Sequence, residues 1–395
     1  MEGSESAFTI GYNGEKFDFG ASITEDVLNK FLLFCSQKKV TDIKIQPGRP
    51  IFGLFANKLE PVSSRTLNTY DMEVVARILY KNENVLAEVN RGTDLDFSYQ
   101  VKREGDVPLR YRVNITGGRY LLTSSFQIVI RAIPGKALPI EQLDIEQSII
   151  DSWRPREGLV LVTGKTGSGK STLLSSGIRM LVEKPDANES VVEYSAPIEY
   201  TYDGIEMPSS VVFQSDPNEH IKPAEGDPDE HSKFAHCVRN ALRRNATIAV
   251  IGEARDRATI RNTIEVSNTG MLIYSTLHTF GVDRTLRRVL SAFPVEEEKS
   301  MAVDLMDSLR MVISQKLVPK VGGGVTGIRE YMIFDDKTRE KFHKKPTHDW
   351  PAMARTMLRN KEVEGQIFLD GTVKALSENK ISEETFKEAA SSGAV

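Results

Sequence analysis

Cysteine, long apolar runs and an excess of charge of one sign are all scarce in this chain of 395 residues. Its two cysteines, Cys35 and Cys237, lie far apart and outside any C-x-x-C pattern, which argues against a disulfide framework and against a cysteine-ligated zinc site. No window offers the roughly 18 apolar residues of a membrane-spanning helix, and no signal-peptide pattern follows Met1. We therefore expect a cytoplasmic protein with no direct membrane insertion.

Basic and acidic residues are nearly balanced. The 51 basic and 55 acidic side chains give a formal net charge of −4, so no global positive field attracts nucleic acid or anionic lipid. Direct nucleic-acid binding is for this reason not expected. Hydrophobic residues form 40% and charged residues 27% of the chain, which is ordinary for folded proteins, and the length suits two or three domains.

The first part of the chain, residues 1–135, predicts a domain of mixed α and β structure. Apolar residues recur at helical spacing after the capping-box sequence Ser22–Glu25 to about Lys38, and again from about Tyr70 to Leu79. Alternating patterns predict strands over residues 41–46, 109–116 and 125–132. One sheet backed by helices is the simplest arrangement of these elements.

Two of the expected strands carry arginine on the face opposite their apolar residues. Arg110 and Arg112 alternate with apolar positions in one strand, and Arg131 opposes the apolar residues of the other. Because side chains alternate between the two faces of a sheet, these arginines are expected to share a polar face.

A change of pattern divides the rest of the chain. Residues 136–157, with Pro139 and Pro155, suit a linker that contains a short helix. From Gly158, short apolar strands alternate with helical patterns, which is typical of a parallel sheet covered by helices on both faces. The expected strands are 159–163, 190–194, 246–251 and 271–275, and the expected helices are 171–182, 234–244 and 258–268.

We assign this α/β domain to residues 158–335. Within it, residues 215–231 are rich in proline and acidic side chains and are expected to form a solvated loop. Helical patterns recur over residues 297–317 and 374–392. Residues 336–395 are therefore assigned to a smaller, helical C-terminal region.

A phosphate-binding motif follows the first strand of the α/β domain. Residues 164–171 read Gly-Lys-Thr-Gly-Ser-Gly-Lys-Ser and match G-x-x-x-x-G-K-[ST] in full, between an expected strand and an expected helix. In such a loop, backbone N–H groups surround a β-phosphate, the lysine contacts the β- and γ-phosphates, and the final hydroxyl ligates Mg²⁺. The residues predicted to bind nucleotide are Gly164, Lys165, Thr166, Gly167, Ser168, Gly169, Lys170, Ser171 and Thr172, with Lys170 on the phosphates and Ser171 on the metal.

Polar residues follow the other expected strands of this domain. Because the carboxyl ends of parallel strands share one edge of the sheet, these residues are expected near the phosphate loop. Glu253 would complete the Mg²⁺ site, Glu199 or Glu193 would activate the attacking water, and His278 would contact the γ-phosphate. The structural alternative for each is a solvated carboxylate, or a histidine satisfied within the fold.

Taken in order, these motifs resemble those of the PilT-type secretion and pilus-retraction ATPases, and in particular the DotB/TraJ branch of type IVB secretion and plasmid conjugation. The resemblance covers about residues 25–335 and is carried by residues 110–116, 164–171, 196–199, 238–244, 251–256, 275–279 and 313–319. It implies a RecA-like P-loop NTPase core with an N-terminal α+β (PAS-like) domain and a small helical C-terminal part. It also implies a cytoplasmic homohexamer that hydrolyses ATP with Mg²⁺ and is recruited peripherally to an inner-membrane secretion or conjugation complex.

The resemblance also implies roles for single residues. Glu199 matches the general base of the family's acidic box, Glu253 its Walker B glutamate, and His278 the second histidine of its His box. Arg112 and Arg131 fall in strands from which such ATPases direct arginines to a neighbouring subunit's phosphates. The chain departs from the family pattern at Ser195 and Ala196, at Met271, and in the longer acidic loop 215–231. The first two departures reduce the number of polar groups around the site.

Three other functions stay open at this stage. A P-loop kinase for a small molecule would need an acceptor pocket and an arginine-bearing lid, and the acidic and His boxes disfavour it. A DNA-translocating RecA-like hexameric motor is a closer alternative, although no basic and aromatic stripe supports it. An ATP-binding assembly scaffold with little turnover is consistent with the departures at positions 195, 196 and 271.

Overall fold

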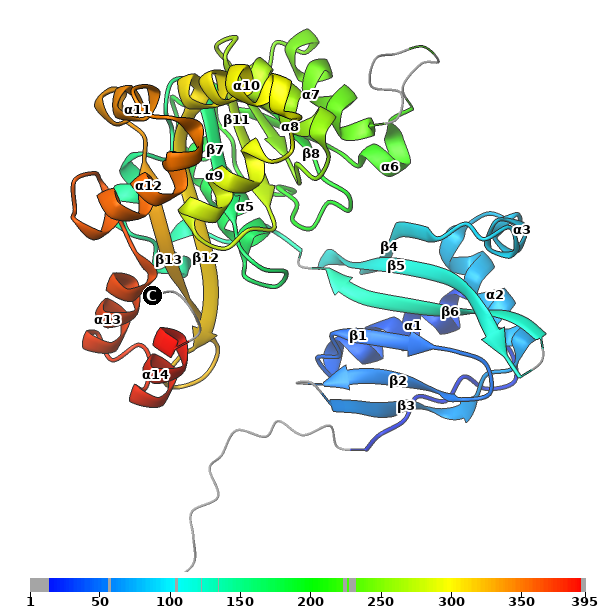
Figure 1. Cartoon of the computed structure of the whole chain (residues 1–395). Coiled ribbons are helices and arrows are strands. Elements are labelled where there is room, and N and C mark those ends of the chain that lie inside the picture. Colours follow the sequence, from blue (N-terminus) through cyan, green and yellow to red (C-terminus); the bar gives the residue numbers. More distant parts are fainter. Residues whose placement is uncertain are drawn as a thin grey trace, which may run out of the picture. The chain divides into compact units, whose positions relative to one another are not determined.

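The structure is a computed structural model that describes residues 14–55, 58–103, 106–121, 123–133, 135–222, 226 and 232–391. The chain divides between Lys136 and Ala137 into two compact units (Figure 1). Residues from 137 onward, including most of the segment expected to act as a linker, belong to the second unit. Separate boundaries at 158, 335 and 336 stay a prediction.

The first unit is a six-stranded antiparallel sheet with helices on one face. The strand order is β3-β2-β1-β6-β5-β4. The strands are β1 (Asp42–Ile45), β2 (Pro50–Phe55), β3 (Lys58–Thr66), β4 (Leu95–Arg103), β5 (Asp106–Tyr120) and β6 (Thr123–Ile133). The helices are α1 (Glu25–Gln37), α2 (Thr69–Tyr80) and α3 (Val85–Asn90). The two expected helices and three expected strands are present, whereas β2, β3, β4 and α3 were not predicted.

Alternation along the strands separates an apolar face from a polar face. Ile43 and Ile45 of β1 are buried in the same cluster as Leu28 and Phe31 of α1. The residues between them, such as Lys44, point to the other face. The helices therefore cover one face of this sheet, and the other carries its charged side chains.

The second unit is built on an eight-stranded sheet of order β14-β13-β12-β7-β11-β10-β8-β9. The strands are β7 (Gly158–Thr163), β8 (Ser190–Tyr194), β9 (Val211–Ser215), β10 (Ile248–Ile251), β11 (Leu272–Leu277), β12 (Leu309–Pro319), β13 (Val325–Ile333) and β14 (Gly365–Gln366). Strands from β12 to β9 run parallel, while β13 and β14 are antiparallel additions. The expected parallel sheet is confirmed.

Helices cover both faces of this sheet. The α-helices are α4 (Gln147–Asp151), α5 (Lys170–Val182), α6 (Pro217–His220), α7 (Lys233–Arg243), α8 (Arg257–Ser267), α9 (Val282–Leu290), α10 (Val295–Ser308), α11 (Asp336–His343), α12 (Trp350–Arg359), α13 (Phe368–Ser377) and α14 (Glu383–Ser391). Short 3-10 turns are η1 (Ile140–Leu143) and η2 (Thr347–Asp349). Leu159 and Leu161 of β7 join one hydrophobic cluster, and Val160 and Val162 join the other. Among the described residues, no helix combines the length and apolarity needed to cross a membrane.

Two helix predictions were wrong in part. The pattern over 297–317 spans α10, which ends at Ser308, and most of β12, which begins at Leu309. Most residues of β12 are buried, and a short apolar run such as Met311–Ile313 does not distinguish a buried strand from a helix. The pattern over 374–392 is also divided, because α13 ends at Ser377 and α14 begins at Glu383.

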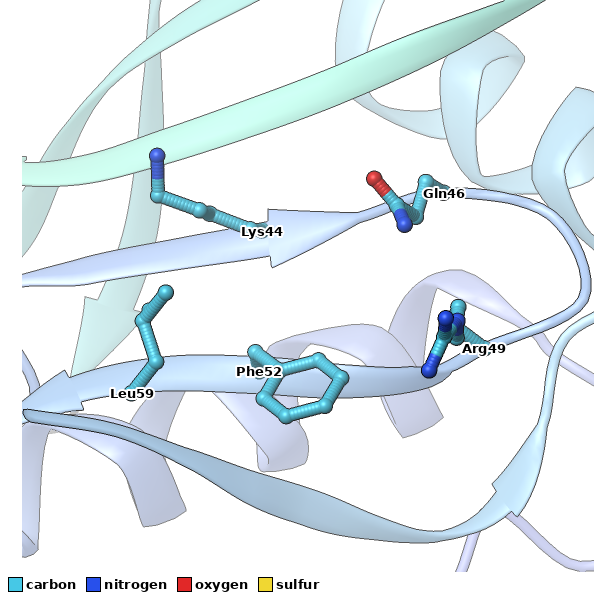
Figure 2. Close-up of a pocket in the computed structure, with 5 residues that line it drawn as sticks. All are labelled: Lys44, Gln46, Arg49, Phe52 and Leu59. Carbon is cyan, nitrogen blue, oxygen red and sulfur yellow. The ribbon is translucent and has the colours of Figure 1, made fainter.

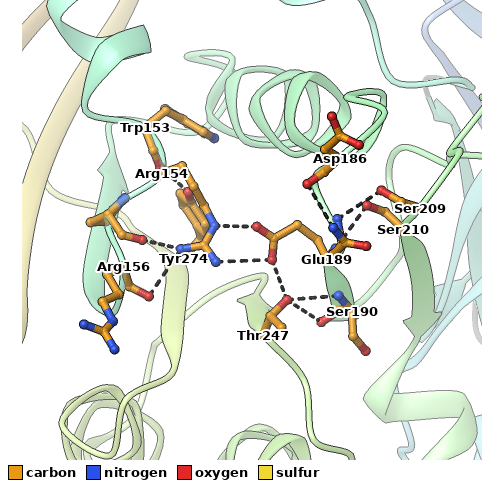
Figure 3. Close-up of polar contacts among 12 residues, drawn as sticks. Trp153, Arg154, Arg156, Asp186, Glu189, Ser190, Ser209, Ser210, Thr247 and Tyr274 are labelled. Carbon is orange, nitrogen blue, oxygen red and sulfur yellow. Dashed lines mark hydrogen bonds and ion pairs between the residues drawn. The ribbon is translucent and has the colours of Figure 1, made fainter.

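A polar network ties the segment before β7 to the amino ends of β8 and β10 (Figure 3). Arg154 Nε donates to Glu189 Oε1 at 2.6 Å, and Thr247 Oγ1 donates to Glu189 Oε2 at 2.5 Å. The Ser190 N–H in turn donates to Thr247 Oγ1 at 2.9 Å. Glu189 is only 7% exposed, so these bonds satisfy a buried carboxylate. The network lies at the sheet edge opposite the phosphate loop.

Candidate active site

The phosphate motif forms a tight loop between β7 and α5. Gly164 and Gly169 have φ angles of 146° and 80°, which favour glycine. Lys170 is buried, and its Nζ donates to the Gly164 and Lys165 carbonyls at 2.9 and 3.1 Å. Ser168 Oγ is buried and has no hydrogen-bond partner among the residues that the structure describes. The loop therefore leads into the amino end of a helix, where anions bind.

Two carboxylates lie close enough to Lys170 to affect its titration. Burial lowers the pKa of Lys170, while the negative charges of Glu253 and Glu199 raise it. Both residues follow strands of the same sheet, Glu253 after β10 and Glu199 after β8. The structure thus brings together three residues that are widely separated in the sequence, at the carboxyl edge of the sheet.

Glu253 contacts an arginine and a histidine side chain. Its Oε2 lies 2.7 Å from Arg255 Nη2, and its Oε1 lies 3.2 Å from His278 Nε2. The Glu253 side chain is 17% exposed and that of His278 is 42% exposed. The carboxylate is therefore held in place, while the imidazole keeps access to solvent.

The two candidates for the water-activating carboxylate have different surroundings. Glu193 lies inside β8 and accepts hydrogen bonds from Ser195 Oγ at 2.9 Å and from Gln214 Nε2 at 3.0 Å. Glu199 is half-buried in the segment after β8. Its neighbour Tyr200 shares a hydrogen bond of 2.7 Å with Thr172 of α5, which ties this segment to the phosphate loop. The surroundings of Glu199 therefore suit a reacting group better than those of Glu193.

Arg112 and Arg131 lie on the polar face of the first unit. They are directly opposite each other in the pairing of β5 with β6. Arg112 is ion-paired with Asp96 of β4, and Arg131 Nε lies 2.7 Å from Asp42 of β1. Each guanidinium is thus oriented by a carboxylate of the adjacent strand, as the predicted polar face requires. Arg110, expected on the same face, is buried at 6% exposure.

The same sheet has a shallow pocket over β1, β2 and β3 (Figure 2). The side chains that line it combine two cations with an amide and two apolar groups, namely Lys44, Arg49, Gln46, Phe52 and Leu59. The Gln46 amide oxygen accepts a hydrogen bond of 2.9 Å from Gln127 Nε2. None of these residues was predicted as functional.

The residues at the phosphate loop suit a nucleotide with Mg²⁺. A glycine-rich loop, a buried lysine and the helix amino end match a polyphosphate. Ser171 lies in the first turn of α5, and Glu253 offers the carboxylate oxygen that Mg²⁺ prefers. Across the described residues, no group of three or more His, Cys, Asp or Glu side chains is placed to hold a metal alone. Phosphate oxygens would therefore have to complete the coordination.

Sequence reasoning missed one buried contact of the phosphate loop. Gln315 of β12 donates to the Ser168 carbonyl at 2.7 Å. The segment 313–319 was part of the family resemblance, but no role was predicted for it, and its residues up to 317 were expected to be helical. The strand assignment of β12 was needed to find this contact.

A parallel α/β sheet with a phosphate loop and carboxylates at its carboxyl edge defines a nucleotide-binding class of protein. The chain matches the family described as Type II/IV secretion system protein over residues 32–381, and it belongs to this family. It is 29% identical over 308 residues to the type IV pilus retraction ATPase PilT of Pseudomonas aeruginosa, covering 78% of this chain and 82% of PilT.

Two solved structures of DotB ATPases are similar along almost the whole chain. The Legionella pneumophila protein is 33% identical with a TM-score of 0.79, covering 95% of this chain and 99% of that one. The Yersinia pseudotuberculosis protein is 28% identical with a TM-score of 0.77, covering 93% and 94%. The predicted resemblance to PilT-type secretion ATPases and their DotB branch is confirmed.

Proposed function

We propose that this protein is a homohexameric motor ATPase, which hydrolyses ATP to ADP and phosphate to power a type IVB secretion or conjugative transfer apparatus. One observation carries the ATPase assignment: Lys170, Glu199 and Glu253 converge at the carboxyl edge of the parallel sheet, beside the phosphate loop. Similarity to DotB over 95% of the chain supports the choice of apparatus.

Nucleotide binding is assigned to residues 164–172 in a RecA-like P-loop core. The backbone N–H groups of the loop and the Lys170 ammonium bind the phosphates. Ser171 and Glu253 hold Mg²⁺, which supplies positive charge to the phosphate oxygens. His278, paired with Glu253 at 3.2 Å, is positioned to respond to the γ-phosphate through this carboxylate.

Hydrolysis requires a base and a source of positive charge opposite the transferred phosphate. Glu199 is the proposed base, because it lies near Lys170 in a segment that the Tyr200–Thr172 hydrogen bond joins to α5, whereas Glu193 is buried inside β8. Arg112 and Arg131 are proposed to act on a neighbouring subunit. A guanidinium has five N–H donors, and the Arg131 side chain is 60% exposed, so its ion pair with Asp42 is compatible with a contact to a phosphate.

The wider assignments rest on family similarity. The N-terminal unit is proposed as the PAS-like domain that delivers the arginines, and residues 336–395 as a C-terminal helical region. The place of action is proposed to be the cytoplasmic side of an inner-membrane secretion or conjugation complex, reached through protein contacts. The alternative is an ATP-binding scaffold with little turnover, which is consistent with the departures from the family pattern at positions 195, 196 and 271.

The first test concerns the lysine. Lys170→Ala should lose tight ATP binding and turnover while the fold is retained, because the ammonium contributes charge at the phosphates. Lys184→Ala is the matched control, since Lys184 lies exposed beyond the other end of α5. Phosphate release and the mass in solution, measured with and without ATP, test enzyme and hexamer together. A hexamer without turnover would support the scaffold, and unchanged hydrolysis by Lys170→Ala would refute the assigned site.

The second test concerns the base. Glu199→Gln keeps the size of the side chain but removes the basic oxygen, so we expect retained ATP binding with kcat lower by about 10²–10⁴-fold. Glu206→Gln, at an exposed position in the same segment, is the control. Wild-type turnover in Glu199→Gln would reject Glu199 and direct attention to Glu193.

A further inference from the structure

Two buried polar side chains link the phosphate loop to a distant part of the second unit. Gln315 of β12 and Arg329 of β13 are paired directly across the two strands. They are 3% and 2% exposed. A buried charge and a buried amide are costly unless their hydrogen bonds are made, so the partners of this pair matter.

Both the nitrogen and the oxygen of the Gln315 amide form hydrogen bonds. Its Nε2 donates to the Ser168 carbonyl at 2.7 Å, and its Oε1 accepts from Arg329 Nε at 2.7 Å. Because a guanidinium only donates, the amide oxygen must face Arg329 and the amide nitrogen must face the loop. Arg329 thus determines which way the amide of Gln315 points.

Arg329 is itself held by the segment that precedes the phosphate loop. Its Nη1 donates to the Asp144 carbonyl and to Glu146 Oε2, both at 3.0 Å. Its Nη2 donates to the Leu143 carbonyl at 3.1 Å. The guanidinium is therefore fixed on three sides, and its orientation does not depend on the phosphate loop.

The phosphate loop packs tightly on Gln315. A Cβ atom on Gly164 would lie 2.4 Å from the Gln315 carbonyl oxygen, and a Cβ on Gly169 would lie 2.8 Å from Gln315 Nε2. Both distances are too short for a side chain. Gly164 and Gly169 therefore allow the loop to lie in close contact with this one residue of β12.

The bond to Ser168 has a consequence for the next peptide N–H. In a trans peptide the carbonyl of Ser168 and the N–H of Gly169 point in opposite directions. When Gln315 holds the carbonyl on one side of the loop, the N–H of Gly169 is directed to the other side, away from β12. That side is where a phosphate would lie in the proposed nucleotide site.

We infer that Gln315, oriented by Arg329, is a positioning residue that sets the Gly169 N–H toward the nucleotide phosphates. The inference rests on the proposed nucleotide-binding function and adds a determinant of the affinity of the same site. Since the N–H contacts phosphate both before and during reaction, its misplacement raises KM and the nucleotide Kd more than it lowers kcat.

Two substitutions of Gln315 separate positioning from packing. Gln315→Glu keeps an acceptor for Arg329 but replaces the donor with a second acceptor, which repels the Ser168 carbonyl. Gln315→Met keeps the volume and removes both hydrogen bonds. Affinity for a fluorescent ATP analogue in the full chain should fall about 5- to 10-fold in Gln315→Met. The fall should be larger in Gln315→Glu, with kcat within a few-fold of wild type.

A matched control comes from the opposite edge of the sheet. Thr247→Val keeps the shape of the side chain and removes a hydrogen bond from the buried Glu189 carboxylate, so it should lower the melting temperature without changing nucleotide affinity. Amide exchange over residues 164–170 gives a readout without nucleotide, and it should be faster in Gln315→Met than in Thr247→Val.

The outcomes are distinct. Wild-type affinity and wild-type exchange in Gln315→Met overturn the inference, even if Gln315→Glu fails to fold. An equal loss of affinity in Thr247→Val assigns the effect to general destabilisation and also overturns it. A wild-type protein that binds no ATP analogue rejects the proposed function, while the exchange comparison still tests whether Gln315 orders the loop.

Discussion

Gly177, in the middle of α5, offers a test in which local preference and tertiary packing predict opposite results. Alanine is favoured over glycine in a helix by about 1 kcal/mol, so Gly177→Ala should stabilise the isolated helix. In the structure, however, a Cβ on Gly177 would lie 2.0 Å from Cζ2, 2.1 Å from Cε2 and 2.5 Å from Nε1 of Trp153. Ordinary contacts between such atoms are about 3.5–4 Å.

Trp153 has little freedom to move away. It is fully buried, and its ring stacks on Tyr274 with centroids 5.3 Å apart. The Tyr274 hydroxyl also donates to the Trp153 carbonyl. Relief therefore requires the helix or the indole to shift by more than about 1 Å, which places the overpacking cost at about 3 kcal/mol or more. After the helix-propensity gain, we expect a net loss of about 2 kcal/mol.

Urea unfolding followed by circular dichroism measures this loss. Gly371→Ala in α13 is the matched control, because the nearest atom to its added Cβ would lie at 3.1 Å and belongs to the Gln366 side chain. We expect that variant to stay within about 1 kcal/mol of wild type.

The same substitution in a Trp153→Phe background tests whether the indole ring causes the loss of stability. Trp153 Nε1 has no hydrogen-bond partner among the described residues, so Trp153→Phe removes steric bulk without breaking a side-chain hydrogen bond. Gly177→Ala should be much less damaging in Trp153→Phe than in wild type. Greater stability of Gly177→Ala than wild type, in the wild-type background, would refute the packing argument.

Two further predictions concern catalysis between subunits and pH. Arg112→Ala or Arg131→Ala should bind nucleotide within a few-fold of wild type but lose turnover. Mixing either variant with Glu199→Gln should restore some phosphate release, because some interfaces of a mixed ring pair an intact Glu199 with an intact arginine. Complete absence of rescue, in rings shown by labelling to contain both chains, would place the arginines outside a neighbour's site. Burial raises the pKa of Asp216 from 3.8 to about 6. The folded state then binds this proton more tightly than the unfolded state, so the Asp216 contribution to stability falls as the pH rises from about 4 to about 6, by at most about 3 kcal/mol. Asp216→Asn can still accept the hydrogen bond from the Asn218 N–H but does not titrate, so it should lack this pH-dependent contribution. Identical pH profiles of the urea midpoint in wild type and Asp216→Asn would contradict the raised pKa of Asp216.

The helix and strand boundaries of the second unit were predicted more accurately where glycine, polar or charged residues mark the ends of an element. The helix after the phosphate loop and the strands ending before Glu253 and His278 are bounded by glycine, polar or charged residues. These boundaries agree with the structure to within a few residues. The pattern across residues 297–317 contains no glycine or proline where α10 gives way to β12, and the strand conformation of β12 follows from its place between β7 and β13. Neighbouring strands supply hydrogen bonds that no local pattern contains.

The amino-acid sequence by itself determined the phosphate loop, the alternation of strands and helices, and the polar strand face that carries Arg112 and Arg131. Each of these depends on residues close together in the chain, whose spacing reflects the period of a helix or a strand or the geometry of a turn. Only the tertiary structure decided which carboxylate lies near Lys170, that His278 contacts Glu253, and that Gln315 reaches Ser168. These contacts join residues far apart in the chain, so they depend on strand order and register, which the packing of the whole sheet determines.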